Sequence, residues 1–402
     1  MHLGIIFIIA FLLTADLVAW RLALRWLKRY APSKMLRLAA HSFFAMQTGY
    51  VIVLILAGTA HAQHVMAWIP LGVQAMIYIW HLLFLPATMV IWSLVGLAGA
   101  GRWLVQRCRS PKPELPALVL ADDSGKGMSR RDMLLASVAI VPPLMAMSTA
   151  GYSRATLWQF RVSRQVLPVF GLPAALEGFR IAHVSDLHVG RWSTRSFLES
   201  VVEATNALDA DVVTFTGDLI DVSIDDLPLA VATFKRFRAR QGAFIIEGNH
   251  DLIDDPAAFR KAMTDEGLRF LRGSSVMLKQ RGTAIEFMGV PWSHSEEQIR
   301  QEVLSIAGKR DIGAFPILLA HHPHSFDAAA EVGLPLTLSG HTHGGQIALN
   351  REINAGRMLF RYVSGIYQRG GSKLLVSNGI GNWFPLRIGA PAEIIEITLA
   401  QG

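Results

Sequence analysis

The sequence predicts an α/β domain preceded by an α-helical transmembrane region. Hydrophobic residues make up 51% of the chain and charged residues 17%, and the apolar excess falls before Arg154. Long apolar segments occupy this first part. After Arg154, short apolar runs alternate with helical patterns, as expected for a buried sheet covered by helices. The chain therefore divides into a part predicted to lie in a membrane and a globular part.

Four segments of the first part are long and apolar enough to cross a bilayer, which requires about 20 residues each. They are residues 3–20, 36–57, 71–97 and 133–150. The third leaves two interpretations open, because apolar character extends over 65–99 with Pro70 and Pro86 inside. One long or broken helix is favoured over two spans. We therefore predict a transmembrane region at 1–151 with about four spans.

The basic residues indicate how these spans are oriented. Lysine and arginine gather between the first two spans and between the last two, whereas the connection Gly58–Ala67 contains neither. Positively charged loops stay in the cytoplasm, so everything after Ala150 is predicted to lie outside. This predicts a multi-pass protein of a bacterial inner membrane with a periplasmic or extracytoplasmic domain. The net charge of +7 then reflects topology, and no basic face interleaved with aromatic residues indicates nucleic-acid binding.

Two further features concern the loops of the first part. The only cysteine, Cys108, falls in a predicted cytoplasmic loop, which excludes a disulfide framework, a thiol nucleophile and a zinc–thiolate site in the globular part. The stretch MSRRDMLLAS at 128–137 resembles a twin-arginine export signal. Arginines that merely hold a helix end inside are an equally good interpretation, and both give the same orientation.

A connecting segment, 152–178, precedes the globular domain predicted at 179–402. Short runs rich in β-branched and aromatic residues indicate buried strands: FRIAHVSD, DVVTFTGD, GAFIIEGN, FPILLAHH and LTLSGHTH. Helical patterns lie between them at 194–208, 228–238, 256–266 and 296–306. This alternation predicts an α/β domain with a mostly buried sheet.

Polar residues directly follow five of these strands. They are Asp186 and His188, then Asp218, then Asn249 and His250, then His321, and finally His341 and His343. Ligands of open α/β sheets bind outside the carboxyl ends of the strands, so these side chains should meet at one edge. A donor set of Asp, His and Asn without Cys suits Mn, Fe, Zn, Co or Ni. The candidate ligands also outnumber those that one tetrahedral zinc ion needs. Two ions that share Asp218 would use the set economically.

The order of these motifs resembles that of the calcineurin-like metallophosphoesterases. DLH at 186–188, GDLID at 217–221, GNHD at 248–251, a single His at 321 and GHTH at 340–343 occur in the family's order. The resemblance covers Phe179–Leu399 and implies a sandwich of two sheets flanked by helices. GHTHGGQI and the late run SNGIGNWFPLRIGAPAEIIEITL look like the membrane-associated bacterial branch, which includes phosphodiesterases acting on lipid-type substrates. GVPW at 289–292 stands where that branch usually has an acidic residue.

The resemblance also implies a role for each motif residue. One divalent metal ion would be held by Asp186, His188 and His343, a second by Asn249, His321 and His341, with Asp218 bridging the two. The ions would be Mn, Fe or Zn, and a hydroxide between them would be the nucleophile. His250, oriented by Asp251, would bind the phosphoryl oxygen and protonate the leaving group. The implied protein is a membrane-anchored, metal-dependent phosphoesterase, favoured as a phosphodiesterase of a lipid-type substrate.

Other interpretations of nearby residues stay open. His183 is expected to be a packed core histidine, and His322 or His324 could replace the preferred His321 as a ligand. Asp221 is compatible with a contact to the site and equally with a solvated turn.

Two rival functions also stay open. One is a pyrophosphatase of the UDP-2,3-diacylglucosamine type, whose cytoplasmic substrate conflicts with the predicted topology. The other is a non-catalytic membrane sensor or scaffold, against which the full set of ligands argues. The sequence does not identify the substrate, the metals or the oligomeric state.

Overall fold

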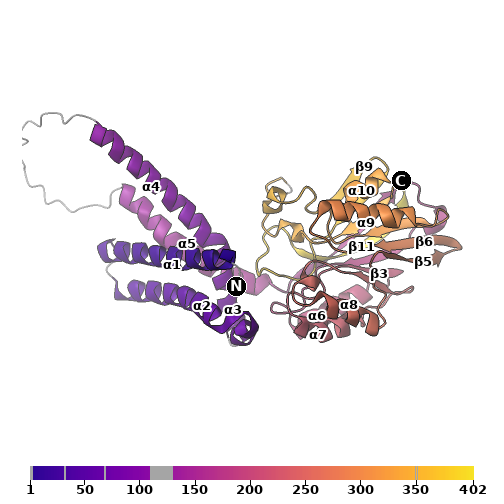
Figure 1. Ribbon diagram of the computed structural model, residues 1–402, viewed down its shortest axis with the longest axis horizontal. Coiled ribbons are helices and arrows are strands. Elements are labelled where there is room, and N and C mark those ends of the chain that lie inside the picture. The colour runs from indigo at the N-terminus through magenta and orange to yellow at the C-terminus, as the bar shows by residue number, and fades with distance from the viewer. Residues whose placement is uncertain (1–2, 31–32, 68, 109–129, 349, 351) are drawn as a thin grey trace, which may run out of the picture. The chain divides into compact units, whose positions relative to one another are not determined.

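The computed structural model describes residues 3–30, 33–67, 69–108, 130–348, 350 and 352–402. The chain divides into two compact units, Met1–Arg154 and Ala155–Gly402. We call the first the helical unit and the second, which contains both sheets (Figure 1), the α/β unit. The loop at 109–127 between the last two predicted spans lies outside the described residues, as do the first two residues of the 128–137 stretch.

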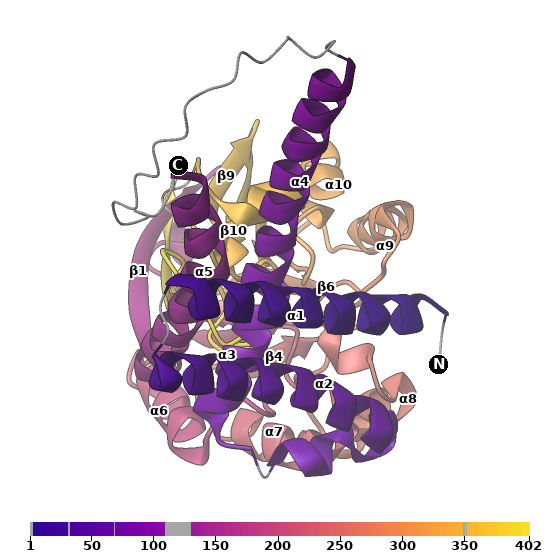
Figure 2. The same ribbon diagram turned by 90° about the vertical axis from the view of Figure 1, so that its left-hand side faces the viewer.

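The helical unit consists of long apolar helices. They are α1 (Leu3–Tyr30), α2 (Lys34–Ala67), α3 (Leu71–Ile79), the π-helical turn η1 (Trp80–Phe84), α4 (Leu85–Cys108) and α5 (Arg130–Thr156). Helices α1 and α2 lie side by side (Figure 2). The third apolar segment forms one helix interrupted by η1, as the favoured interpretation expected. Pro86 lies just after this π-helical turn, where a helix can accommodate the missing N–H.

Among the described residues, one helix has the length and apolar composition needed to cross a membrane. It is the 38-residue helix Leu71–Cys108, formed by α3, η1 and α4. The other three predicted spans lie within α1, α2 and α5. That these three helices cross a membrane stays a prediction.

A buried polar cluster links α1 to η1. The indole Nε1–H of Trp80 donates to Oδ1 of the fully buried Asp16 over 2.7 Å, and Nε2 of His81 lies 3.0 Å from Oδ2. Nδ1 of His81 lies 2.9 Å from the carbonyl oxygen of Ile77. Because a carbonyl only accepts, Nδ1 carries a proton, and the carboxylate and Nε2 share one more. We call these three side chains the Asp16 cluster; each of its polar atoms has a partner.

Two mixed sheets form the α/β unit. The first has the order β1 (Phe160–Val169), β11 (Ala392–Gln401), β2 (Arg180–Val184), β3 (Val212–Thr216) and β4 (Ala243–Ile246). The second has the order β5 (Ser274–Gln280), β6 (Thr283–Gly289), β7 (Phe315–Leu319), β8 (Leu336–Ser339), β10 (Ser372–Val376) and β9 (Gly365–Arg369). Strands β2, β3 and β4 are parallel to one another, and so are β6, β7, β8 and β10. Parallel strands bring their carboxyl ends to one edge.

Helices cover the outer face of each sheet (Figure 1). Helices α6 (Arg195–Asn206), α7 (Leu227–Phe234) and α8 (Pro256–Asp265) pack on the first sheet, and α9 (Glu296–Gly308) and α10 (Ser325–Glu331) on the second. Side chains alternate along β4: Phe244 and Ile246 face the other sheet, whereas Ile245 packs with the helices. The predicted sandwich of two sheets flanked by helices is confirmed.

The segment predicted to connect the two parts belongs to the first sheet. Strand β1 lies within it and pairs in parallel with β11 along all of Phe160–Val169. The compact α/β unit accordingly begins at Ala155. The polar, half-exposed side chains of β1 hide this strand from a search for short apolar runs.

Candidate metal centre

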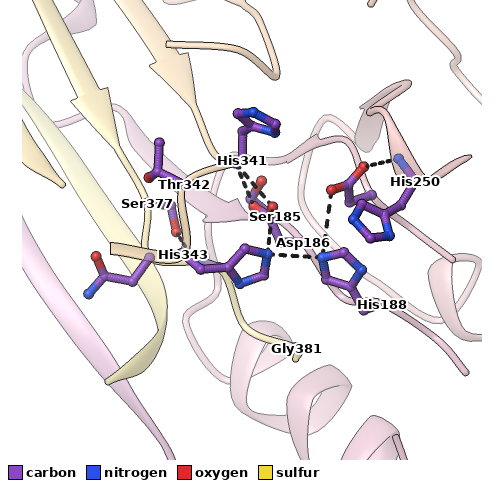
Figure 3. A network of polar contacts seen from close by, with 12 residues as sticks. Ser185, Asp186, His188, His250, His341, Thr342, His343, Ser377 and Gly381 are labelled. Carbon is purple, nitrogen blue, oxygen red and sulfur yellow. Dashed lines mark hydrogen bonds and ion pairs between the residues drawn. The ribbon is translucent and has the colours of Figure 1, made fainter. Parts of the chain in front are cut away.

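The loops that follow five strands bring the predicted ligands together. Asp186 and His188 follow β2, Asp218 follows β3, Asn249 and His250 follow β4, His321 follows β7, and His341 and His343 follow β8. Figure 3 shows the imidazoles of His188 and His343 facing each other and the backbone of His341 bound to Asp186. Both sheets therefore supply side chains to the same site.

The first group of potential ligands consists of Asp186, His188, Asp218 and His343, all buried. The Nε2 atoms of His188 and His343 are 3.0 Å apart. His343 Nε2 lies 3.3 Å from Asp186 Oδ1, and His188 Nε2 lies 3.6 Å from Asp218 Oδ2.

The second group consists of Asp218, His321 and His341, with Asn249 beside it. His321 Nε2 lies 3.1 Å from Asp218 Oδ2, 3.1 Å from Asn249 Oδ1 and 3.3 Å from His341 Nδ1. Asp218 belongs to both groups, so its carboxylate lies where the two meet.

The chemistry of these donors fits divalent metal ions. Ligand atoms bound about 2.0–2.2 Å from one ion lie roughly 3–3.5 Å from each other, and the distances between donors in the two groups fall near this range. Burial lowers the pKa of His341 and His343 well below the usual value, which leaves their imidazoles neutral, as metal binding requires. Nδ1 of His321 lies 2.6 Å from the carbonyl oxygen of Thr216, so that Nε2 is left free to bind.

The charges of the second group favour an ionised carboxylate. Burial alone would raise the pKa of Asp218, but the neighbouring His321 and His188 hold it well below the usual value. Burial likewise acts to lower the pKa of His321, yet Asp218 outweighs it and raises this pKa to about 9. His321 therefore carries a proton on the nitrogen that faces Asp218, and a metal ion bound there would have to displace this proton.

The backbone is strained at the predicted ligands. Eight non-glycine residues in the described part of the chain have positive φ, and five of them are Asp186, His188, Asp218, His341 and His343, with φ from 46° to 74°. This conformation costs roughly 1–2 kcal/mol per residue for an L-amino acid. Strain of this kind persists where the surrounding structure imposes it, typically at functional sites.

Two glycines allow the close approach of the loops. A Cβ at Gly340 would lie 2.2 Å from Oδ2 of Asp186, and one at Gly248 would lie 2.2 Å from Oδ1 of Asp218. Any side chain at either position would displace a predicted ligand.

The partner of His250 differs from the prediction. Asp251, expected to orient this imidazole, instead accepts hydrogen bonds of 2.8–3.0 Å from the backbone N–H groups of Asp218, Leu219 and Ile220 and one of 2.9 Å from Gly248. The short helix η4 (His250–Leu252) turns the Asp251 carboxylate toward that backbone.

Asp221 takes the position that the sequence assigned to Asp251. Nδ1 of His250 lies 2.6 Å from the carbonyl oxygen of Asp221 and 3.5 Å from its Oδ1, and Nδ1 of His188 lies 3.4 Å from the same Oδ1. Burial acts to lower the pKa of His250, but Asp221 and Asp218 outweigh it and raise the pKa to about 9. Of the two interpretations left open for Asp221, the structure favours contact with the site.

One residue at the site was missed in the sequence. The guanidinium of the half-buried Arg387 donates through Nη2 to Nδ1 of His343 (2.8 Å) and to the backbone oxygen of Gly381 (2.6 Å), and through Nη1 to the backbone oxygen of Asn378 (2.7 Å). Because an arginine only donates, Nδ1 of His343 accepts. No spacing rule points to Arg387, since it reaches the site from a loop 44 residues away.

The other histidines lie outside both groups. His183 is buried on β2, where Nδ1 lies 3.2 Å from Thr214 Oγ1 and Nε2 lies 3.3 Å from the carbonyl oxygen of Ser339, as expected for a core histidine. His322 and His324 belong to none of the ligand groups found among the described residues, and Nδ1 of His324 instead lies 3.0 Å from Glu296. The structure thus brings His321 into the site, rather than either alternative.

Comparison with known proteins matches residues 179–345 to the family described as calcineurin-like phosphoesterase. A protein of Bacillus subtilis strain 168 named uncharacterized metallophosphoesterase YkuE is 28% identical over 68% of this chain and 98% of its own length. A Bos taurus protein named transmembrane protein with metallophosphoesterase domain is 28% identical over 77% of this chain and 74% of its own. For an uncharacterized metallophosphoesterase of Helicobacter pylori strain J99, also 28% identical, the alignment covers 55% of this chain and 59% of that protein.

A solved structure also aligns with the chain. The alignment with the protein TT1561 of Thermus thermophilus covers 51% of this chain and 90% of that one, with 12% identity and a TM-score of 0.37.

Proposed function

We propose, from the premise that this chain carries a calcineurin-like phosphoesterase domain at residues 179–345, that it is a membrane-anchored phosphodiesterase dependent on two divalent metal ions. The match confirms the resemblance seen in the five motifs. The observation that carries the proposal is the position of Asp218, whose carboxylate belongs to both groups of potential ligands.

Each group would hold one ion, with Mn, Fe or Zn as the expected metals. Asp186, His188 and His343 would hold the first, Asn249, His321 and His341 the second, and Asp218 would contact both. When bound, such ions supply Lewis acidity at the phosphoryl group and a nucleophile at neutral pH. Asp251, bound to four backbone N–H groups, keeps the loops after β3 and β4 in register.

In this proposal, His250 donates a proton to the leaving group. Its Nδ1–H donates to the carbonyl oxygen of Asp221, so that Nε2 is the nitrogen left to meet a substrate. The backbone N–H of His250 donates to Oδ1 of Asp218 over 2.8 Å, which fixes the backbone of His250. His250 also belongs to a third group of possible ligands, with His188 and Asp221, but the proposed roles leave it out of both ion sites.

Two observations and one prediction from the sequence support a membrane anchor and a membrane-borne substrate. The helix Leu71–Cys108 can cross a bilayer by length and composition. The Bos taurus relative is named as a transmembrane protein. The basic loops predicted to be cytoplasmic would place the α/β unit outside an inner membrane. An enzyme anchored in this way meets lipid-linked phosphodiesters at high local concentration, which favours them as substrates.

The test uses the purified full chain, stripped of metal by a chelator and reloaded with Mn, Fe or Zn. We expect elemental analysis to give two metal equivalents, and bis(p-nitrophenyl) phosphate to be hydrolysed faster than p-nitrophenyl phosphate. Zinc loaded into His183→Gln serves as a control for nonspecific histidine binding, because this core imidazole lies outside both groups. A stoichiometry that never exceeds one would reject the two-ion proposal, and faster monoester hydrolysis would reject the phosphodiesterase.

A further inference from the structure

Trp292 borders the second group of potential ligands. It follows β6, and its ring centroid lies 4.9 Å from that of His341 and 5.4 Å from those of His321 and His322. The indole is therefore a neighbour of two potential ligands of the second group. Trp292 has none of the roles assigned so far.

A pocket of about 730 Å³ opens beside this indole. It is lined by Asn249, Leu252, Ile253, Trp292, Ser293, His294, Ser295 and Gln298. Since Asn249 is also a potential ligand of the second group, the pocket adjoins the candidate metal centre. Its volume lies in the range of small-molecule sites, about 300–1,000 Å³.

The lining of this pocket carries no aspartate, glutamate, lysine or arginine. Its hydroxyl groups are already engaged, because Ser293 Oγ donates to Gln298 Oε1 over 2.5 Å and Ser295 Oγ accepts from the backbone N–H of the same glutamine. Besides the imidazole of His294, the lining offers apolar area, including that of Ile253, which is 52% exposed. Trp292 therefore contributes the apolar area of its ring to the pocket, since its Nε1 is buried away from it.

We propose that this pocket binds the uncharged, alkyl-bearing alcohol of a phosphodiester, and that Trp292 determines the specificity for it. The inference rests on the proposed function, because the phosphoryl group is positioned by the candidate metal centre next to the pocket. A second phosphate in the pocket would meet no lysine or arginine, and an unpaired charge there costs free energy. The pocket therefore selects against a nucleoside diphosphate and in favour of an alkyl ester.

The binding test compares dimethyl and dibutyl phosphate on the metal-loaded full chain in nanodiscs, by isothermal titration calorimetry. Each buried methylene improves affinity about fourfold, so the wild type should bind dibutyl phosphate at least about tenfold more tightly. Trp292→Ala should reduce this ratio to within about twofold, whereas Trp292→Phe, which keeps a large ring, should retain most of it. Trp292→Asp, which adds a negative charge, should favour dimethyl phosphate.

The matched control is Ile312→Ala, an apolar residue 95% exposed at the opposite end of β7 from His321. It should keep the wild-type ratio. Equal affinities of the wild type for both phosphates, or an unchanged ratio in Trp292→Ala, would overturn the role of the pocket.

Kinetics separate this inference from the proposed function. If methyl and butyl p-nitrophenyl phosphates are hydrolysed with equal kcat/KM, the chain is a phosphodiesterase and the pocket inference is wrong. If no phosphodiester is hydrolysed by protein with full metal content, both proposals fail. A preference for the butyl ester that disappears in Trp292→Ala supports both.

Discussion

Each unit of this protein buries carboxylates beside imidazoles. The two clusters differ in whether their imidazole nitrogens need a further proton or cation between them. In the helical unit, Asp16 receives one hydrogen bond from Trp80 and shares a proton with His81, whose other nitrogen also has a partner. In the α/β unit, His188 and His343 bring two Nε2 atoms within 3.0 Å of each other. Two imidazole nitrogens so close can share a single proton or face one cation.

This difference shows what separates a structural polar cluster from a binding site. In the Asp16 cluster, Asp16 lies in α1 and the other two side chains in the π-helical turn η1, none of them at positive φ, whereas the loops around Asp218 hold five predicted ligands in left-handed conformation. A protein retains such strain where function requires the geometry. We infer that the first cluster is complete in itself and that the second is shaped for metal ions.

The largest difference between the two clusters is expected for Asp218→Asn, which keeps the shape of the side chain and removes its charge. Both ligand groups lose their shared carboxylate, so metal content and activity on every substrate should fall to background. Elemental analysis and hydrolysis of bis(p-nitrophenyl) phosphate measure the two effects. The matched control Asp16→Asn should leave the metal content of the α/β unit unchanged. Wild-type metal content in Asp218→Asn would refute the shared role of this carboxylate.

The next largest effect is expected for His250→Ala, which should keep its metals and lose activity. A general acid contributes typically about 10²–10⁴-fold, so the loss should fall in that range. It should shrink when the leaving group is nitrophenolate, which hardly needs a proton. Rates on aryl and alkyl phosphodiesters compare the two cases. An equal loss on both would mean that the imidazole stabilises phosphoryl charge instead of donating a proton.

A substitution in the Asp16 cluster should lower stability and leave activity unchanged. Asp16→Ala leaves the N–H of Trp80 and the imidazole of His81 without their partner, and breaking a buried pair in this way costs about 3–5 kcal/mol. Thermal unfolding in detergent should show a destabilised helical unit, with hydrolysis per folded molecule unchanged. If unfolding is unaffected, the Asp16 cluster contributes nothing to the packing of α1.

The smallest effect concerns Asp226, a half-buried carboxyl group close to the acidic residues near the site. Burial, together with Asp221 and Asp225, raises its pKa to about 6. Because the folded-state pKa exceeds the unfolded value, its contribution to stability is present below about pH 4 and is lost as pH rises through 6. Asp226→Asn should therefore raise the free energy of unfolding at pH 8 by less than about 1 kcal/mol, given its exposure. Denaturant unfolding at pH 4 should show no difference, and a stabilisation confined to low pH would contradict the sign.

The sequence predicts the site better than the partners of its residues. The strands before Asp186, Asp218, Asn249, His321 and His341 are short, apolar and parallel, so each polar residue that ends one marks the shared edge of the sheet. Strand β1 escapes this reasoning, because it pairs with β11 from the far end of the chain and exposes polar side chains.

Asp221, rather than Asp251, contacts the imidazole of His250 for a similar reason. Adjacency in the sequence suggests Asp251 as the partner of His250, but the turn of η4 carries its carboxylate to the backbone after β3. Arg387 and Trp292 reach the site from loops whose course depends on tertiary packing. Patterns along the chain therefore identify the site residues that directly follow strands, and they miss the site residues that lie in more distant loops.

The carboxylate of Asp251 has a consequence for how a metal would be taken up. With its four backbone partners it joins the loops after β3 and β4 before any ion arrives. The entropy of ordering these loops is then already spent during folding, so cation binding need not supply it. We therefore expect the site to be preorganised, so that its spacing discriminates among ions by radius. In hydrogen exchange, the amides of Asp218, Leu219 and Ile220 should accordingly be as protected without metal as with it.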